Sequence, residues 1–515
     1  MKKQSLIKGS IILGAAGILT RFLGLFFRWP LIMLIGDEGI GYYQMSYPLY
    51  MFFIAMASGV PVAMSKIISE KNATNDIEES FEVMKESAIL MAIIGTGTTL
   101  ALFFFAKPII LFLKWDSKAY YSLIGISFAP IVISFVTIFR GFFQGLQNMT
   151  PSAISQIIEQ IGRVVFGVGL AVFLLPKGIE YSAGGAAFGA TAGAVIGGSY
   201  LYSHYKRVKK SYKIKKVRSN PEILSTILKI AIPISLGTTV GSVMNLIDSI
   251  LVPQELLKAG LTNTQATVLY AQLTGKASVI INIPLTLSMA ICTSLVPIIA
   301  ENFVLKRKKG LKNKIDASMK MSAIISIPCT MGLFFMAEPV MKFIFPGRFD
   351  GIEILKYLSL AIPFIIITQT TTAILQGTGN YIKPVINLSI GCIIKIILTC
   401  ILVPMEAFNI YGAVIATCGA YTFVSILNII TMKFALRIKL NLYEILIKPT
   451  YAAIIMMIFV LISYNIIYKK TISNGVSCLL SIFLGMIIYV ILIIIFRVFS
   501  MEDIKSRFKT YSKRN

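Results

Sequence analysis

The sequence predicts an all-α polytopic membrane protein with about fourteen transmembrane helices, arranged as two six-helix lobes related by a pseudo-two-fold repeat plus two C-terminal helices. Three observations carry this prediction. Of the 515 residues, 56% are hydrophobic and only 14% are charged. Windows of about 20 mainly apolar residues, long enough to cross a bilayer, recur along the chain. A short motif at one helix junction returns in the second half of the chain.

The expected spans follow the apolar windows in chain order. They cover residues 6–35, 42–66, 84–107, 120–146, 153–175, 181–204, 223–252, 267–300, 315–337, 353–377, 384–404, 410–436, 446–468 and 475–498. The first is too long for the apolar region of a signal peptide and leads directly into further spans, so we expect it to be retained. No segment between spans exceeds about twenty residues, which is too short to bury a core of its own. Any function must therefore lie within the membrane bundle.

The formal net charge of +26 is explained by its placement along the loops. With the N-terminus inside, roughly 33 Lys and Arg fall on the inner side and about 9 on the outer side, which is the positive-inside pattern. This predicts a multi-pass protein of the cell membrane with both termini in the cytoplasm. The basic blocks also suit anionic lipid headgroups, so membrane lipids are expected partners and nucleic acid is not.

Several classes of site are missing from the sequence. The six cysteines all fall inside expected spans without a close-paired spacing, so neither a disulfide framework nor a zinc site is indicated. The chain contains no P-loop, dinucleotide fingerprint, HExxH or G-x-S-x-G motif. We therefore expect no catalytic residue, no metal and no cofactor, and a protein that is not an enzyme.

A repeated motif divides the chain. Its copies consist of Gln144, Gly145 and Asn148 in the first half and of Gln376, Gly377 and Asn380 in the second, each followed by a proline and another apolar helix. A weaker echo pairs GVPVAMSKIISE with TSLVPIIAE. The alternative is that the motif reflects only the turn chemistry that follows a helix. The repeat predicts an N-terminal lobe (1–205), a basic cytoplasmic linker (206–222), a C-terminal lobe (223–436), and two extra helices with a basic cytoplasmic tail (437–515).

The first span carries two arginines, Arg21 and Arg28, inside an apolar segment. A guanidinium near the bilayer centre costs about 2.5 to 3.5 kcal/mol even on lenient scales, so these residues need a role. Steps of three and four residues place them on one helical stripe with Ser10, Gly14, Gly17 and Gly24. A stripe of small residues permits close helix packing or leaves room for a cavity. Arg28 can instead extend to the outer interface.

Other ionisable residues also fall within spans. Lys276 and Lys395 can line the opposing wall of a central cavity, or be paired or extended toward an interface. Glu159 and Arg163, spaced four residues apart, can form an ion pair along one helix face. Asp248 can form a salt bridge or bind a cation. The excess of cations favours an anionic cargo, and arginine suits phosphate or pyrophosphate because its planar fork binds two oxygens at once.

The segments TRFLGLFFR, IGDEGIGYYQMSYP and GVPVAMSKIISE resemble the N-terminal region of the stage V sporulation protein B family. That family belongs to the polysaccharide and lipid-linked oligosaccharide flippases of the MOP superfamily and is related to the MurJ lipid II flippases. The resemblance implies a MOP/MATE-like bundle that alternates between inward-open and outward-open states. It also implies that Arg21 lies in the central cavity and is needed for function. Arg28 falls one residue out of register with the second arginine of Gram-negative relatives.

The resemblance implies a cargo as well, an undecaprenyl-pyrophosphate-linked peptidoglycan precursor destined for the spore cortex. The alternatives are a flippase for another lipid-linked polysaccharide and a MATE-like cation-coupled exporter. Outside transport, a scaffold that recruits a cell-wall polymerase and a membrane-embedded transferase are the other classes. Cell-wall polymerases are candidate partners, and a self-contained two-lobe bundle makes a monomer the expected state.

Overall fold

The computed structural model describes residues 6–74, 76–212, 221–438, 441, 443–496 and 498. Within these residues the regular structure is helical and contains no strand, which confirms the predicted all-α polytopic class. Two basic segments named above extend beyond this part of the chain. Residues 213–220 of the expected linker and residues 501–515 of the expected tail lie outside the described residues.

The helices of the first half include the longest one, α1. In chain order they are α1 (Leu6–Ala57), α2 (Gly59–Ala73), α3 (Ile77–Phe104), α4 (Ala106–Phe112), α5 (Ala119–Ser127), α6 (Ala129–Gly145), α7 (Thr150–Leu174), a 3₁₀ turn (Leu175–Lys177) and α8 (Ile179–Ser211). A kink divides α1 at Gly36, where φ is 65° and ψ is −170°. Glycine adopts this positive φ without a Cβ clash, so the chain can turn there. The kink lies between the first two expected spans. Without it, the two spans would form one continuous helix.

The second half continues the helical pattern. Its elements are α9 (Pro221–Lys258), α10 (Asn263–Ala271), a π-helical turn (Gln272–Ala277), α11 (Ser278–Val304), α12 (Lys308–Phe335), α13 (Ala337–Ile344), α14 (Ile352–Leu358), a 3₁₀ turn (Ser359–Ala361), α15 (Ile362–Gly377), α16 (Ile382–Leu402), α17 (Ile410–Leu436), a second π-helical turn (Tyr443–Ile447), α18 (Lys448–Thr471) and α19 (Asn474–Ile495). Each expected span from residue 223 onward overlaps one of these helices or a run of them.

Twelve helical segments of the described chain are long and apolar enough to cross a membrane. The first, Ile12–Asn72, overlaps both of the first two expected spans. The Gly- and Ala-rich helix α8 is not among the twelve, although an expected span lies within it. Its small residues serve close packing instead, because a Cβ on Gly189 would lie 2.5 Å from the Cα of Gly167 on α7. Such contacts are typical of helix pairs in membranes.

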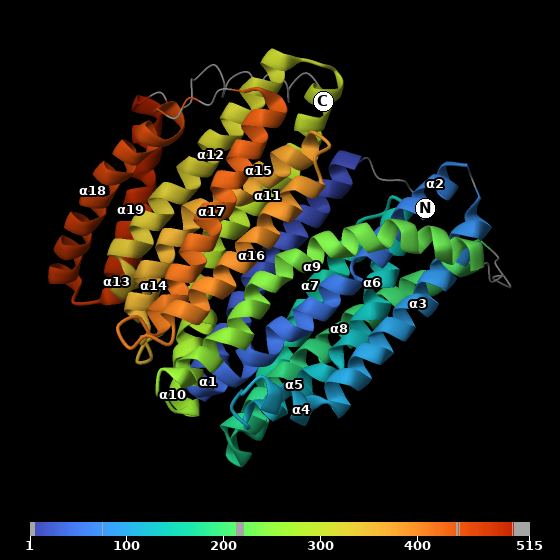
Figure 1. Ribbon diagram of the computed structural model, residues 1–515, viewed down its shortest axis with the longest axis horizontal. Coiled ribbons are helices and arrows are strands. Elements are labelled where there is room, and N and C mark those ends of the chain that lie inside the picture. The colour runs from blue at the N-terminus through green and yellow to red at the C-terminus, as the bar shows by residue number, and fades with distance from the viewer. Residues whose placement is uncertain are drawn as a thin grey trace. The chain divides into compact units, whose positions relative to one another are not determined.

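The chain divides into two compact units by its internal packing. One comprises residues 1–275 and 396–413, and the other comprises residues 276–395 and 414–515. In the first unit α7 packs along α8 and α1, while in the second α11 packs on α15 and α18 on α19 (Figure 1). These units describe packing rather than repeats. The expected lobes, bounded by the linker at 206–222, remain a prediction from the sequence.

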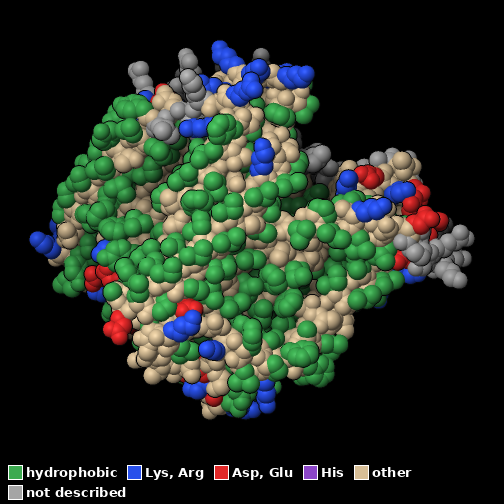
Figure 2. Space-filling model, viewed as in Figure 1, with side chains coloured by type: hydrophobic (Ala, Val, Ile, Leu, Met, Phe, Trp, Pro, Cys, Tyr) green, Lys and Arg blue, Asp and Glu red, His purple; other side chains and the backbone are tan. Residues whose placement is uncertain are grey.

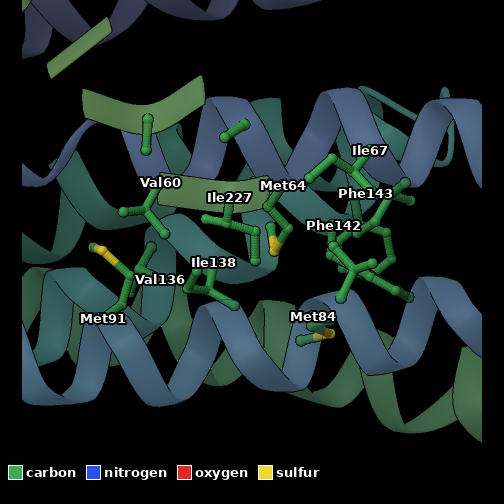
Figure 3. Packing of buried hydrophobic residues seen from close by; sticks show 14 of the residues in the cluster. Val60, Met64, Ile67, Met84, Met91, Val136, Ile138, Phe142, Phe143 and Ile227 are labelled. Carbon is green, nitrogen blue, oxygen red and sulfur yellow. The ribbon is translucent and has the colours of Figure 1, made fainter. Parts of the chain in front are cut away.

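The exterior and interior of the bundle are both apolar. Figure 2 shows hydrophobic side chains over most of the visible face, with Lys and Arg gathered toward its margins. Large exposed side chains such as Phe112, Val304 and Phe434 would cost free energy in water, whereas lipid accommodates them. Inside the first unit, Met64 of α2, Met84 of α3, and Phe142 of α6 belong to one buried cluster (Figure 3). The chain is therefore a multi-pass membrane protein.

Candidate functional site

Arg28 of α1 points into the protein. Its side chain is half-buried, and its Nη1 donates a hydrogen bond of 3.4 Å to the carbonyl oxygen of Thr274. The Nε2 of Gln44 donates to the same oxygen at 2.9 Å. Thr274 lies in the π-helical turn Gln272–Ala277, and π turns shift the backbone hydrogen-bond register, frequently at functional sites. This hydrogen bond joins Arg28 to the π-helical turn, and a place for Arg28 in a central cavity stays a prediction.

Arg163 of α7 is held by aromatic rings from both parts of α1. Its Nη2 donates to the Tyr43 hydroxyl at 3.2 Å, and its guanidinium carbon lies 5.1 Å from the Tyr47 ring centre and 5.6 Å from that of Phe27. The face of an aromatic ring attracts a cation most strongly where water is displaced. These rings were not predicted from the sequence. The helical spacing of Tyr43, Tyr47 and Tyr50 is the signal that would have shown them as one face.

Glu159 does not pair with Arg163 as the sequence predicted. Its Oε2 accepts a hydrogen bond of 2.7 Å from Nη2 of Arg140 on α6, whose Nε donates to the Ser155 hydroxyl at 2.9 Å. The correction has a physical reason: Glu159 faces α6, whereas Arg163, one turn further along α7, faces the rings of α1. Arg140 is a second residue that was not predicted from the sequence. A lone charge inside the apolar window 120–146 was the available signal.

Asp248 of α9 joins the surroundings of Arg28. It is half-buried and interacts electrostatically with the hydroxyl of Tyr270, as Arg28 also does. That hydroxyl donates to the carbonyl oxygen of Gln44 at 3.2 Å. Three of the predicted residues of the first unit, Arg28, Arg163 and Asp248, are therefore linked through Tyr43, Gln44 and Tyr270, because Arg28 also interacts with Tyr43.

Arg21 has an exposed side chain on α1. The small residues of its stripe leave room around it. A Cβ added to Gly14, Gly17 or Gly24 would meet no atom within 4 Å among the described residues. The stripe is thus open rather than a seam of close helix packing, which was the other expectation. The side chain of Ser10 lies outside the described residues.

The two lysines expected on a cavity wall are buried in the second unit. Lys276 is 1% exposed, and its Nζ donates to the carbonyl oxygens of Arg348 at 2.7 Å and Asp350 at 3.4 Å. Lys395 of α16 is 2% exposed and interacts with Cys418 of α17. Of the placements open for Lys276, these hydrogen bonds correspond to pairing, here with backbone carbonyl groups of the loop between α13 and α14. A place on the wall of a central cavity stays a prediction for both lysines.

The repeated motif forms a helix-ending turn in its first copy. The N–H of Gln147 donates to Gln144 O at 2.9 Å, and the N–H of Asn148 donates to Phe143 O at 2.9 Å. Gln147 has a φ of 56°. This pair of bonds is a Schellman motif, which satisfies the last carbonyl groups of α6.

The second copy has the same bonds. The N–H of Gly379 donates to Gln376 O at 3.0 Å, and the N–H of Asn380 donates to Leu375 O at 2.9 Å. The residue with positive φ is here Gly379, at 82°. The two copies of the motif therefore form the same helix-ending turn, one in each compact unit.

The glycines of the motif add a tertiary contact. A Cβ on Gly145 would lie 2.7 Å from the Cβ of Ile68, and a Cβ on Gly377 would lie 2.9 Å from the Cβ of Ile299. Ile68 and Ile299 each stand two residues before the glutamate that ends the echoed segments GVPVAMSKIISE and TSLVPIIAE. Motif and echo thus meet in the same way in both units, which turn chemistry alone does not require.

These features define a class of protein: a helical membrane bundle of transporter type, with repeated helix junctions and cations on its first helix. The family model described as polysaccharide biosynthesis protein matches residues 6–303, and a second model, MatE, matches residues 233–401. The first match covers more than half of the chain, so the chain belongs to the polysaccharide biosynthesis protein family. The resemblance inferred above from the opening motifs is confirmed at the level of this family.

Three relatives extend the comparison over the whole chain. Stage V sporulation protein B of Bacillus subtilis is 27% identical over 518 residues, covering 98% of each chain. Lipid II flippase MurJ of the same organism is 28% identical over 473 residues, covering 87% of this chain and 85% of the relative. A solved structure of lipid II flippase MurJ, in an inward closed conformation, has a TM-score of 0.73 at 19% identity and covers 94% of this chain and 98% of its own. The last likeness supports the fold alone.

Proposed function

We propose that the protein is a flippase that moves an undecaprenyl-pyrophosphate-linked peptidoglycan precursor of the lipid II type from the inner to the outer leaflet of the plasma membrane, for spore cortex synthesis. The observation that carries the proposal is similarity over 98% of both chains to stage V sporulation protein B. The similarity to lipid II flippase MurJ supports the cargo class. Both termini lie in the cytoplasm in this proposal, as the loop charges favour.

Arg21 is the residue proposed to bind the pyrophosphate. Its side chain is exposed on α1, and Gly14, Gly17 and Gly24 leave space along the same stripe. A guanidinium presents parallel N–H donors that match two phosphate oxygens, and it keeps its charge at any physiological pH. Arg28 is the second residue of this stripe. Because it is anchored on Thr274, it would orient α1 and add positive potential rather than enclose the headgroup.

Movement would follow the alternating exposure of one binding region to the two leaflets. In this proposal the lobes are residues 1–205 and 223–436, joined by the basic linker, and residues 437–515 add two helices to the second lobe. The matching contacts of Gly145 with Ile68 and of Gly377 with Ile299 support this division. No nucleotide-binding motif is present in the sequence, so a gradient, the membrane potential or the supply of precursor would drive transport.

Two neighbouring functions share this architecture. A flippase for another lipid-linked polysaccharide would use the same arginine, since the pyrophosphate is common to such carriers, and the family description favours it directly. A MATE-like cation-coupled exporter is favoured by the second family match over residues 233–401. A cationic cargo would suit an acidic site better than the exposed guanidinium of Arg21.

The test is a reconstituted vesicle assay with fluorescent lipid II in which a membrane-impermeant quencher reports the accessible leaflet. We expect the wild type to equilibrate the lipid between leaflets and Arg21→Ala to lose the activity. Lys210→Ala, which removes an exposed charge at the end of α8, is the matched control and should remain active. Equal rates for wild type and protein-free vesicles would overturn the function. Full activity of Arg21→Ala would overturn the role of this residue.

A further inference from the structure

The first compact unit contains a cavity of about 250 Å³ between the end of α1 and helices α2, α3, α6 and α7. Apolar side chains such as Phe53, Met91 and Ile133 line one part of it. The polar part is lined by Arg140, Gln144 and Gln156 and by hydroxyl groups. None of these residues belongs to the stripe of Arg21. Met91 also belongs to the hydrophobic cluster of Figure 3, so one wall of the cavity rests on the packed interior of the unit.

Arg140 gives this cavity a fixed hydrogen-bond donor without a net charge. Its Nε donates to Ser155 at 2.9 Å and its Nη2 to Glu159 at 2.7 Å. Both ionic side chains are 14% exposed, so the carboxylate compensates the guanidinium where water is scarce. The Nη1 nitrogen makes no hydrogen bond within the described part of the chain. It remains available for a ligand in the cavity.

Two amide side chains complete the polar wall. Gln144 follows Arg140 by one helical turn on α6, and Gln156 comes from α7. Neither amide makes a hydrogen bond to any described residue, although both side chains are half-buried. Together they offer four N–H donors and two carbonyl acceptors. In a membrane bundle, unsatisfied polar groups are costly, so water or a ligand is expected to satisfy them.

This inventory fits a neutral ligand rich in hydroxyl or acetamido groups. An anion would need net positive charge, which Glu159 cancels, and a cation would need a carboxylate that is not already paired. The apolar side around Phe53 and Ile133 suits the C–H face of a sugar ring. The volume corresponds to about eight water molecules and falls below the roughly 300 to 1,000 Å³ of drug-sized pockets, so one ring is the suitable size.

We propose that this cavity binds one sugar ring of the glycan headgroup, through Arg140, Gln144 and Gln156. The identity of the glycan rests on the proposed function, whereas the sugar chemistry rests on the cavity itself. The depth of the cavity agrees with this role. The rings of Phe27 and Tyr43 pack 5.9 Å apart across the kink at Gly36, so the two parts of α1 run back alongside each other there. By helix rise, Phe53 then lies within about one turn of the level of Arg21.

The experiment measures binding of free N-acetylglucosamine to the detergent-solubilised full chain by saturation-transfer NMR, with inorganic pyrophosphate as a second probe. We expect saturable binding of the sugar by the wild type, weakened about tenfold or more in Gln144→Leu and in Gln156→Leu, because each loses hydrogen bonds worth a factor of ten or more. Gln160→Leu, which alters an amide on α7 outside the cavity lining, should bind like the wild type. Arg21→Ala should keep sugar binding and lose pyrophosphate binding.

The two Leu substitutions lie on different helices. If one variant fails to fold, which thermal unfolding would show, the other variant still tests the sugar site. Absence of sugar binding by the wild type, or unchanged binding in a folded Leu variant, would overturn the sugar site. Pyrophosphate binding that survives Arg21→Ala but is lost in Gln156→Leu would show an anion site instead. If the sugar binds but lipid II is not transported, the sugar site stands and the proposed cargo is wrong. If lipid II is transported but the sugar does not bind, the proposed cargo stands and the sugar site is wrong.

Discussion

Glu159 accepts a hydrogen bond of 2.7 Å from Arg140, on the neighbouring helix, and not from Arg163, one turn along its own. Both members of the pair are 14% exposed, in a segment that the bilayer would surround. Breaking a buried pair leaves one charge uncompensated, which costs more than the pair itself contributes. The relationship therefore makes a quantitative prediction about substitutions.

We expect Glu159→Gln and Arg140→Met each to lower the free energy of unfolding by about 3 to 5 kcal/mol, and the double variant to recover much of that loss. The measurement is a double-mutant cycle by denaturant unfolding in detergent. The matched cycle combines Glu159→Gln with Arg163→Met and should show a coupling energy below about 0.5 kcal/mol. A larger coupling to Arg163 than to Arg140 would restore the pairing predicted from the sequence.

The difference between these pairings shows what the sequence could and could not determine. Apolar windows predicted the spans, because the bilayer imposes a length and a composition on each helix. The partner of Glu159 depends on how α6 and α7 are rotated about their axes, which the 19-residue separation between Arg140 and Glu159 does not encode. The sequence predicted a break between the first two spans, but it did not predict that the chain turns at Gly36.

A second prediction separates the two arginines of α1. Arg28→Ala should lower the free energy of unfolding by about 1 to 3 kcal/mol, since the carbonyl of Thr274 loses a charged donor. Arg21→Ala should change it by less than about 0.5 kcal/mol, because its side chain is exposed. Unfolding curves of both variants under identical detergent conditions provide the comparison. Equal destabilisation by the two substitutions would contradict the difference in placement.

A third prediction concerns Lys276, whose Nζ donates to Arg348 O and Asp350 O. In Lys276→Met the side chain keeps its length but the two carbonyl groups lose their donor, which costs about 1 to 3 kcal/mol when the groups stay buried. We expect faster amide hydrogen exchange in residues 345–351, measured by mass spectrometry. Lys342→Met, at the exposed end of α13, is the control and should leave that exchange unchanged.

The surroundings of Lys276 could not be predicted from composition alone. A lysine in an apolar span can face a cavity, extend toward an interface or bind backbone carbonyl groups, and the three cases have the same local sequence. Its partner Arg348 lies 72 residues away, in a loop between short helices. Only the tertiary fold of the second unit brings that loop to Lys276. The same applies to Arg28, whose acceptor Thr274 is 246 residues distant.

The last prediction tests the internal repeat through its glycines. In Gly145→Ala the new methyl group would lie 2.7 Å from the Cβ of Ile68, and in Gly377→Ala 2.9 Å from that of Ile299. Real Cβ contacts do not reach these distances, so the helices must separate, at a cost of about 1 to 3 kcal/mol each. Gly17→Ala, where the methyl group meets open space, should be tolerated.

Because the two contacts lie in different compact units, the costs in the double variant Gly145→Ala/Gly377→Ala should add to within about 0.5 kcal/mol. Ile68→Gly and Ile299→Gly remove the Cβ atom that the new methyl group meets, so each should partly rescue the alanine at its own glycine and not at the other. Rescue across the units, or equal tolerance of all three alanines, would show that the paired sequence motifs do not correspond to paired helix contacts.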